Sequence, residues 1–142
     1  DAFHERWLGR FLHAGADAVL LAMDGETVAG YLVGAFQDPA QQSRFADISY
    51  FRGAFRDLCR RYPAHLHINL APAYRGAGTG AKLISAFAER AEAARAPGMH
   101  VVTGKGARNV GFYVRCGFVL QGETTWNGRD IVFLGKPLHP PV

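Results

Sequence analysis

A glycine-rich loop lies near the middle of the chain, between an apolar run and an amphipathic run of helical spacing. Its letters are RGAGTG, from Arg75 to Gly80. Glycines let a backbone approach a ligand closely, and the start of a following helix directs its N–H groups at an anion. The pattern therefore predicts a phosphate-binding loop. Three cofactor classes are bound by loops of this kind: nucleoside triphosphates, dinucleotides and acyl-coenzyme A.

Two of these classes fit the surrounding letters poorly. A nucleoside triphosphate loop needs G-x-x-x-x-G-K-[ST], and counting from Gly76 places Ala81 at the second glycine and Leu83 at the hydroxyl position. Gly76, Gly78 and Ala81 do match the dinucleotide pattern G-x-G-x-x-G/A. However, the stretch about 20 residues further on, GMHVVTGKGARN, has no carboxylate to bind a ribose. We therefore expect neither a protein with a nucleoside triphosphate loop nor a dinucleotide-dependent oxidoreductase.

The elements that must position the loop follow from hydrophobic periodicity and turn signals. The predicted strands are 17–23, 27–36, 65–70, 99–104, 118–126 and 129–138, and the predicted helices are 2–13, 50–63, 80–96 and 107–117. Asp24-Gly25 and Asn127-Gly128 predict tight hairpin turns, the second of type I′. The fold class expected is α+β (an α/β three-layer arrangement), with a mixed, mostly antiparallel central sheet flanked by helices.

Composition limits the classes of function. The chain has 142 residues, of which 49% are apolar, and a net charge of +4, so one domain over 1–142 is expected. This charge is too small, without a concentrated basic face, to predict nucleic-acid binding. No apolar run approaches the roughly 20 residues of a membrane span, so no membrane partner is expected. Cys59 and Cys116 lie far apart and outside any CxxC pair, which predicts reduced thiols and a cytoplasmic location.

The segment 38–62 interrupts the regular pattern. It begins as a polar loop and continues as the predicted helix 50–63, and it is rich in aromatic residues, which argues against disorder. A long irregular segment inside a compact domain usually has a function. We therefore interpret 38–62 as a loop-helix insert.

Two motifs carry a resemblance to a known family. HINLAPAYRGAGTGAKLI, residues 67–84, resembles the coenzyme-binding motif of the GNAT superfamily of acetyltransferases, whose pattern R/Q-x-x-G-x-G/A begins here at Arg75. NVGFYVRCGF, residues 109–118, is similar to that family's second motif. The order of elements agrees over essentially the whole chain, apart from an apparently missing or trimmed first strand and first helix. A narrower resemblance, carried mainly by the HLHI strand, is to bacterial relatives of the acetyltransferase-like C-terminal domain of O-GlcNAcase.

The resemblance implies that acetyl-CoA is the acetyl donor and that an amine accepts the acetyl group. Backbone amides of the loop would hold the pyrophosphate, and a backbone amide near Leu70 would polarise the acetyl carbonyl. Tyr113 would act as the general acid for the departing thiolate. Asn109 is interpreted as a ligand of the coenzyme arm, as a helix N-cap, or as both, since the two uses are not exclusive. The expected cofactor-binding residues are Leu70, Arg75, Gly76, Ala77, Gly78, Thr79, Gly80, Asn109 and Tyr113.

The sequence does not single out one residue as the general base. Many members of the resembled family use a carboxylate on or near the strand that precedes the glycine loop, whereas this strand offers His65, His67 and Asn69 on one face. His67 is the best candidate by its titration range, with Asp47 and Glu123 as rivals. His65 and His67 lack an evident third ligand, so no metal is expected.

The acceptor is expected to be a small-molecule or protein amine. Segment 38–62 and the last hairpin around Trp126 flank the open end of the central strands, so we expect both to shape the acceptor site. An alternative hypothesis is a catalytically weak or inactive domain that binds acetyl-CoA and serves as an interaction module. The missing carboxylate base and the O-GlcNAcase resemblance favour that alternative.

Overall fold

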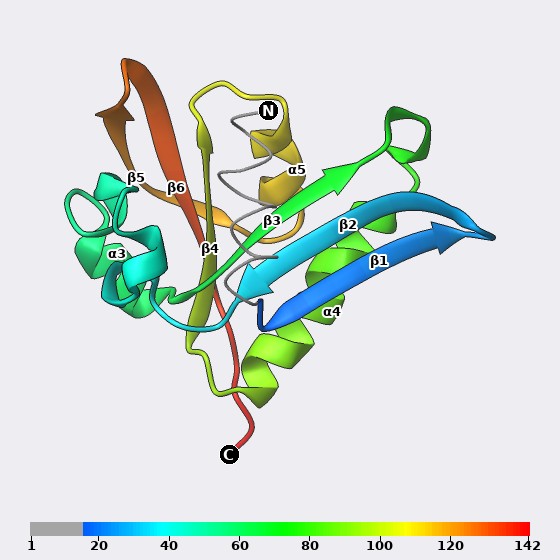
Figure 1. Cartoon of the computed structure of the whole chain (residues 1–142), viewed down its shortest axis with the longest axis horizontal. Helices are drawn as coiled ribbons and strands as arrows, with labels where there is room; N and C mark the ends of the chain where they lie inside the picture. Colours follow the sequence, from blue (N-terminus) through cyan, green and yellow to red (C-terminus); the bar gives the residue numbers. More distant parts are fainter. Residues whose placement is uncertain (1–15) are drawn as a thin grey trace.

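The chain folds around one six-stranded sheet, seen face-on in Figure 1. A computed structural model describes residues 16–142, and the strands lie side by side in the order β1-β2-β3-β4-β6-β5. Strands β3 and β4 are parallel, and every other neighbouring pair is antiparallel. The strands are β1 (Ala18–Asp24), β2 (Thr27–Ala35), β3 (Ala64–Leu70), β4 (Gly98–Gly104), β5 (Val119–Trp126) and β6 (Arg129–Pro137). The prediction of a mixed, mostly antiparallel sheet is confirmed.

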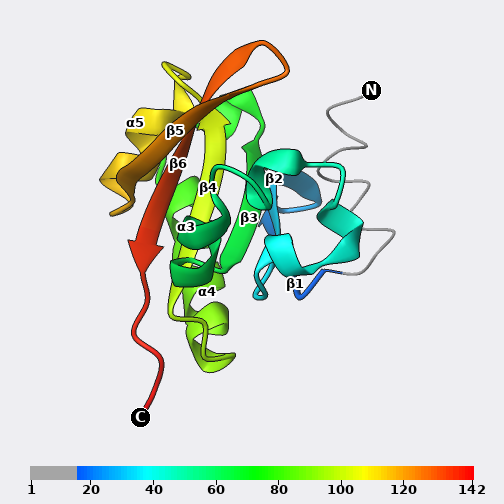
Figure 2. The same ribbon diagram turned by 90° about the vertical axis from the view of Figure 1, so that its left-hand side faces the viewer.

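Helices and short turns cover the two faces of this sheet, which gives three layers (Figure 2). Helices α4 (Thr79–Ala93) and α5 (Asn109–Arg115) cover one face. The segment 38–62 covers part of the other face and contains α3 (Arg56–Arg61). The short 3-10 turns are η2 (Pro39–Gln41), η3 (Ser43–Phe45), η4 (Ser49–Phe51) and η5 (Pro72–Tyr74).

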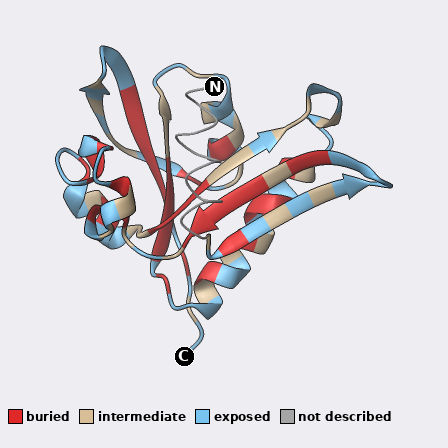
Figure 3. Ribbon diagram, in the orientation of Figure 1, coloured by how far each residue is buried: buried red, intermediate tan, exposed pale blue. Residues whose placement is uncertain are grey.

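Each face of the sheet carries its own hydrophobic core, and the buried residues of Figure 3 follow the central strands and the inner sides of the helices. On the α4 side, the helix buries Leu83, Ile84, Phe87 and Ala91, which recur at the spacing of an amphipathic helix. On the other side, aromatic residues of segment 38–62 pack against β2 and β6. The alternation predicted for β3 is confirmed, since Leu66 faces the α4 side and His65 contacts the aromatic residues of the other core.

Segment 38–62 is less helical than predicted. The helix expected over 50–63 is limited to α3, and the residues before it form tight turns in which Gly53 N–H donates to Ser49 O and Phe55 N–H to Tyr50 O. Glycine is a weak helix former, and the turns let Tyr50, Phe51 and Phe55 all be buried. The expectation of a helix over 50–63 is therefore wrong in its first half.

The remaining predicted elements agree within one or two residues at most ends. Helix α4 starts at Thr79, and Asn127 and Gly128 both have positive φ angles, 51° and 75°, as a type I′ turn requires. The predicted helix 2–13 lies outside the described residues, and so does the expected gap at the first strand and first helix of the family.

Candidate functional site

A gap opens in the middle of the sheet, between β3 and β4. These strands pair only where Ala64 meets Met99 and where His65 meets His100, and they diverge beyond that point (Figure 1). Ala71 N–H donates to the carbonyl oxygen of Ala29 at 2.9 Å, on the β2 side of this part of the chain. Alternate residues of a strand direct their backbone groups to the same neighbour, so Leu70 directs its N–H group into the gap. The gap is therefore lined by backbone groups that β2 does not use.

The glycine loop follows β3 directly and leads into α4. Gly76 and Gly78 both have a φ angle of +84°, and a Cβ added at either would meet no other atom within 4 Å. Only glycine adopts this left-handed backbone readily. The first intrahelical bond runs from Lys82 N–H to Gly78 O, which leaves the preceding N–H groups of α4 available to an anion.

The loop forms one wall of a cavity of about 970 Å³ between α4, α5 and the end of β3, which we term the glycine-loop cavity. The expected cofactor residues that line it are Leu70, Arg75, Gly76, Gly78, Gly80, Asn109 and Tyr113. The other two, Ala77 and Thr79, are not among its lining residues, although they belong to the same loop. The structure therefore brings most of the predicted set to one concave surface.

Gly80 has a different role from the other loop glycines. It is buried at the start of α4, and a Cβ there would lie 2.8 Å from the Phe112 ring of α5 and 3.1 Å from Leu70. Such distances are too short for an ordinary contact. Glycine is needed at this position because α4 and α5 approach each other closely beside the end of β3.

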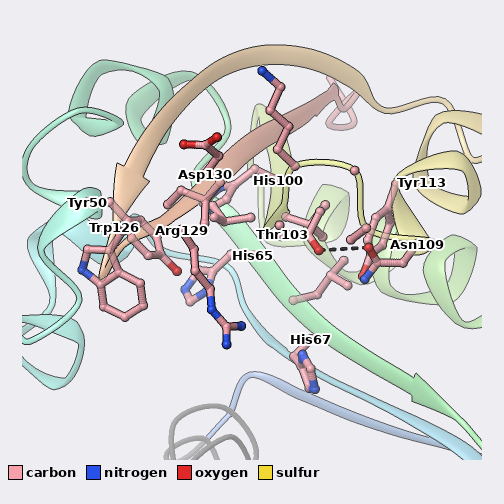
Figure 4. Close-up of a pocket in the computed structure, with 18 of the residues that line it drawn as sticks. Tyr50, His65, His67, His100, Thr103, Asn109, Tyr113, Trp126, Arg129 and Asp130 are labelled. Atoms are coloured by element: carbon pink, nitrogen blue, oxygen red, sulfur yellow. Dashed lines mark hydrogen bonds between the residues drawn. The ribbon is translucent and has the colours of Figure 1, made fainter.

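A second cavity, of about 1010 Å³, lies on the other side of the gap, and we term it the histidine cavity (Figure 4). Segment 38–62 and the β5–β6 hairpin both contribute to its wall. The side chains used in the arguments below are Tyr50, His65, His67, His100, Trp126 and Arg129. The rings of Tyr50 and Trp126 meet edge to face with centroids 5.0 Å apart, and Trp126 Nε1 donates to Ser49 Oγ at 3.2 Å. These contacts hold the hairpin against segment 38–62.

The two cavities meet at Tyr113. Of the described residues, Ile68, Asn109 and Tyr113 line both. Tyr113 is only 5% exposed, and burial raises the pKa of its phenol above the usual range. The hydroxyl is therefore protonated at neutral pH and can act as a hydrogen-bond or proton donor.

Asn109 stands beside Tyr113 at the start of α5. Its Oδ1 accepts a hydrogen bond from Thr103 Oγ1 at 2.9 Å, which joins the start of α5 to the end of β4 (Figure 4). Helix α5 begins at Asn109 itself, and Arg108 occupies the N-cap position without a side-chain capping bond, so the interpretation of Asn109 as the N-cap is wrong. Thr103 satisfies the Asn109 carbonyl oxygen and positions its amide group at both cavities.

Three histidines from β3 and β4 line the histidine cavity. Burial lowers the pKa of His67 to about 4 and also lowers the pKa of His65 and His100, so all three are neutral at physiological pH. His100 Nδ1 donates to the carbonyl oxygen of Tyr62, which fixes the proton on that nitrogen. Sequence reasoning singled out His65 and His67 but missed His100, because its place beside His65 depends on the parallel pairing of β3 with β4.

The rival bases lie elsewhere. Glu123 forms an ion pair with Lys105, with Nζ and Oε2 3.3 Å apart, and is not among the lining residues of either cavity. Asp47 is exposed and is likewise absent from both linings. Within residues 16–142, no three His, Cys, Asp or Glu side chains gather as a metal site requires. None of the helices in that range has the length and apolar character needed to cross a membrane.

Comparison with known proteins identifies the family to which this fold belongs. Residues 15–120 match the family model of the acetyltransferase (GNAT) domain. The chain belongs to the GNAT acetyltransferase family. The glycine loop, the divergence of β3 from β4 and Tyr113 all lie within the matched range of this GNAT domain.

Solved structures of the family share the fold. A GNAT-family acetyltransferase from Streptococcus pneumoniae is 21% identical with a TM-score of 0.64, and the match covers 91% of this chain and 73% of that one. A ribosomal-protein-alanine N-acetyltransferase from Brucella melitensis is 21% identical with a TM-score of 0.62, and the match covers 96% and 78%. A phosphinothricin acetyltransferase from Sinorhizobium meliloti, solved in complex with AcCoA, is 23% identical with a TM-score of 0.61, and the match covers 96% and 66%. The resemblance to O-GlcNAcase relatives is not confirmed by these comparisons.

Proposed function

We propose that this GNAT protein is an N-acetyltransferase that uses acetyl-CoA as donor and transfers the acetyl group directly to an amine. The observation that carries the proposal is the meeting of the glycine-loop cavity and the histidine cavity at Tyr113 and Asn109. Direct transfer needs donor and acceptor to approach one point from two sides, because bringing the reacting groups together removes much of the entropic barrier. Two cavities that share a wall at a proton donor suit this requirement.

The glycine-loop cavity fits the donor. Gly76 and Gly78 leave open space where a side chain would stand, and the N–H groups of Gly76, Ala77, Gly78, Thr79 and Gly80 lie next to the positive end of the 15-residue helix α4. Arg75 lines the same cavity and adds a positive charge. These groups would hold the pyrophosphate of acetyl-CoA, while backbone groups at the β3 edge would bind the coenzyme arm as an added strand.

Acetyl-CoA supplies an acetyl group activated as a thioester. At the gap, the N–H group of Leu70 would polarise the thioester carbonyl, and the Asn109 amide would orient the coenzyme arm. The amine nitrogen forms the new bond to the acetyl carbon while the carbon–sulfur bond breaks. Tyr113 would give its hydroxyl proton to the departing sulfur.

The amine must lose a proton in the same reaction. We retain His67 as the candidate base because it is half-buried in the histidine cavity and neutral at working pH, so its imidazole can accept that proton. A pKa of about 4 makes it a weak base in the absence of substrate. The bound amine would therefore have to be largely deprotonated on arrival, and the reaction would run faster at mildly alkaline pH.

Calorimetry tests the donor assignment. Acetyl-CoA and CoA should bind with similar affinity and NAD should not bind, since the proposed ligand of the loop is coenzyme A. Failure to bind acetyl-CoA would refute the proposal. Mass spectrometry of an amine library incubated with isotopically labelled acetyl-CoA then tests transfer, and binding of acetyl-CoA without transfer to any amine would support the alternative of an inactive binding module.

A further inference from the structure

Charge is distributed unevenly in the histidine cavity. Its charged lining residues are Lys105, Arg129 and Asp130. Lys105 is neutralised by its ion pair with Glu123, whose carboxylate lies 3.3 Å from the Lys105 ammonium group. Figure 4 shows the Asp130 carboxylate pointing away from the Arg129 guanidinium. The Asp130 Oδ1 accepts a long hydrogen bond of 3.4 Å from Thr125 Oγ1. Among the described residues, Arg129 is therefore the charged side chain best placed to contact a ligand in this cavity.

The guanidinium of Arg129 reaches into the cavity from the first residue of β6. Figure 4 shows it between Trp126 and His67, on the side of the cavity opposite Tyr113. No carboxylate within residues 16–142 pairs with it. The three histidines that share the cavity stay neutral because burial lowers their pKa values. Among residues 16–142, the charge that reaches the part of the cavity between Trp126 and His67 is thus the positive charge of Arg129.

We propose that the acceptor is an amine that also carries a carboxylate, and that Arg129 binds this carboxylate. A guanidinium presents paired N–H donors in a planar fork that matches the two oxygens of a carboxylate. One cation suits a monoanion, whereas a dianionic phosphate would need a second positive group. A polyamine would place an uncompensated second cation beside Arg129, which disfavours that class.

The geometry also orients the acceptor. With the carboxylate at Arg129, the amine end extends across the cavity toward Tyr113 and Asn109, where the two cavities meet. The edge-to-face pair of Tyr50 and Trp126 forms an aromatic wall beside Arg129, which suits an apolar linker or side chain of the acceptor. This inference rests on the proposed function and names the substrate class for the same site.

The test compares matched amines. Amino acids of increasing chain length are assayed beside their carboxamides and beside diamines of equal length, and kcat/KM is measured from the release of CoA thiol. The wild-type protein should prefer the acids by roughly 10- to 100-fold over the amides, which is the effect of one charged hydrogen-bonded pair. Equal use of acids, amides and diamines would overturn the proposal.

Variants assign the preference to one side chain. Arg129→Gln should abolish it mainly through a higher KM for the acids, Arg129→Lys should restore part of it, and Arg129→Glu should favour diamines. Arg129 is exposed, so these changes should leave the fold intact. Lys105→Gln is the matched control, since Lys105 lines the same cavity but is already paired. An Arg129→Gln variant that keeps the wild-type preference would also overturn the proposal.

Direct binding separates this inference from the proposed function. The CoA-loaded protein is titrated with the amino acids by calorimetry, and the wild type should bind them at least 10-fold more tightly than Arg129→Gln does. Binding of the acids without any acetyl transfer would refute the proposed function and support the Arg129 site. Acetyl transfer to amides or diamines with no preference for acids would support the proposed function and refute the Arg129 site.

Discussion

The imidazole rings of His65 and His100 stack with their centroids 5.7 Å apart and an interplanar angle of 18°, at the last paired residues of β3 and β4. The Phe45, Phe51 and Phe133 rings surround them. A proton on either ring would place a charge in this apolar setting and against the other ring. Burial is the main cause of their lowered pKa values, and the neighbouring His100 lowers the pKa of His65 further. The paired end of the two strands therefore depends on neutral histidines.

Stability should consequently fall in mild acid. An unfolded histidine titrates near a pKa of about 6.5, whereas folded His100 titrates at about 4. Between these values the unfolded chain binds more protons, so the free energy of unfolding decreases as pH drops from about 6.5 toward 4. The slope is at most about 1.4 kcal/mol per pH unit for each such histidine. Urea unfolding at pH 7.5, 6 and 5 measures it.

A His100→Asn variant provides the control for this prediction. The asparagine amide can still donate to the Tyr62 carbonyl oxygen in place of Nδ1, but it does not titrate. The variant's pH slope should be smaller by up to one proton, whatever its absolute stability. Parallel slopes for variant and wild type would show that His100 does not govern the acid response.

Removal of the Tyr113 hydroxyl should impair transfer and spare binding. Tyr113→Phe keeps the buried ring and loses the proposed proton donor, so kcat should fall by roughly 10²- to 10⁴-fold while the Kd for acetyl-CoA changes little. Steady-state kinetics and calorimetry measure the two quantities. Tyr74→Phe is the matched control. The Tyr74 hydroxyl donates to Asp24 at 2.8 Å, and Tyr74 lines neither cavity. A Tyr113→Phe protein with wild-type kcat would eliminate Tyr113 as the acid.

Gly78 and Gly80 lie close together in the same loop, but they should respond differently to the same replacement. At Gly78 a valine has open space but sits at a φ angle of +84°, so it should block coenzyme binding at a stability cost of about 1–2 kcal/mol. At Gly80 the added Cβ would lie 2.8 Å from Phe112, so Gly80→Val should lower the melting temperature far more. Calorimetry with acetyl-CoA and thermal unfolding of both variants check this. Tight acetyl-CoA binding by Gly78→Val would argue against the cradle.

The two thiols should report on the donor site by their reactivity. Cys116 is half-buried in the lining of the glycine-loop cavity, and burial raises the pKa of its thiol. Cys59 is fully buried, and burial raises its thiol pKa strongly. We expect iodoacetamide to modify Cys116 first, faster at pH 9 than at pH 7, and more slowly with saturating acetyl-CoA. Mass spectrometry of the modified peptides measures the rates, and a Cys116 rate unaffected by acetyl-CoA would contradict the placement of the donor.

The fold could largely be predicted because its signals are local. A few neighbouring residues are enough to predict the conformation in three places: the alternating strand β3, the Asn127-Gly128 turn and the glycine loop. The turns of segment 38–62 could not be predicted, since the burial of Tyr50, Phe51 and Phe55 against the sheet decides their shape. The predicted helix does form around Arg56, as α3, but it begins only after Gly53 and does not include Tyr50 or Phe51.

The candidate site divides in the same way. The glycine loop and Tyr113 are recognisable from motif spacing, whereas His100 and Arg129 carry no local signal. His100 becomes relevant because β4 lies parallel to β3, and Arg129 because the β5–β6 hairpin turns toward the cavity beside segment 38–62. Both relationships join residues far apart in the sequence and exist only after the sheet is assembled.

The small overlap between the two cavities has a consequence for how new acceptor preferences can arise. Segment 38–62 and the tip of the β5–β6 hairpin are held together by the hydrogen bond from Trp126 to Ser49, and both line the histidine cavity, whereas the far end of β6 lines the glycine-loop cavity through Lys136 and Pro137. Segment 38–62 and the hairpin tip, residues 126–130, can therefore be exchanged together for the corresponding segments of another family member, while the rest of β6 and the proposed donor site stay unchanged. Tyr113, at the junction, is the part that such a chimaera must keep from its parent.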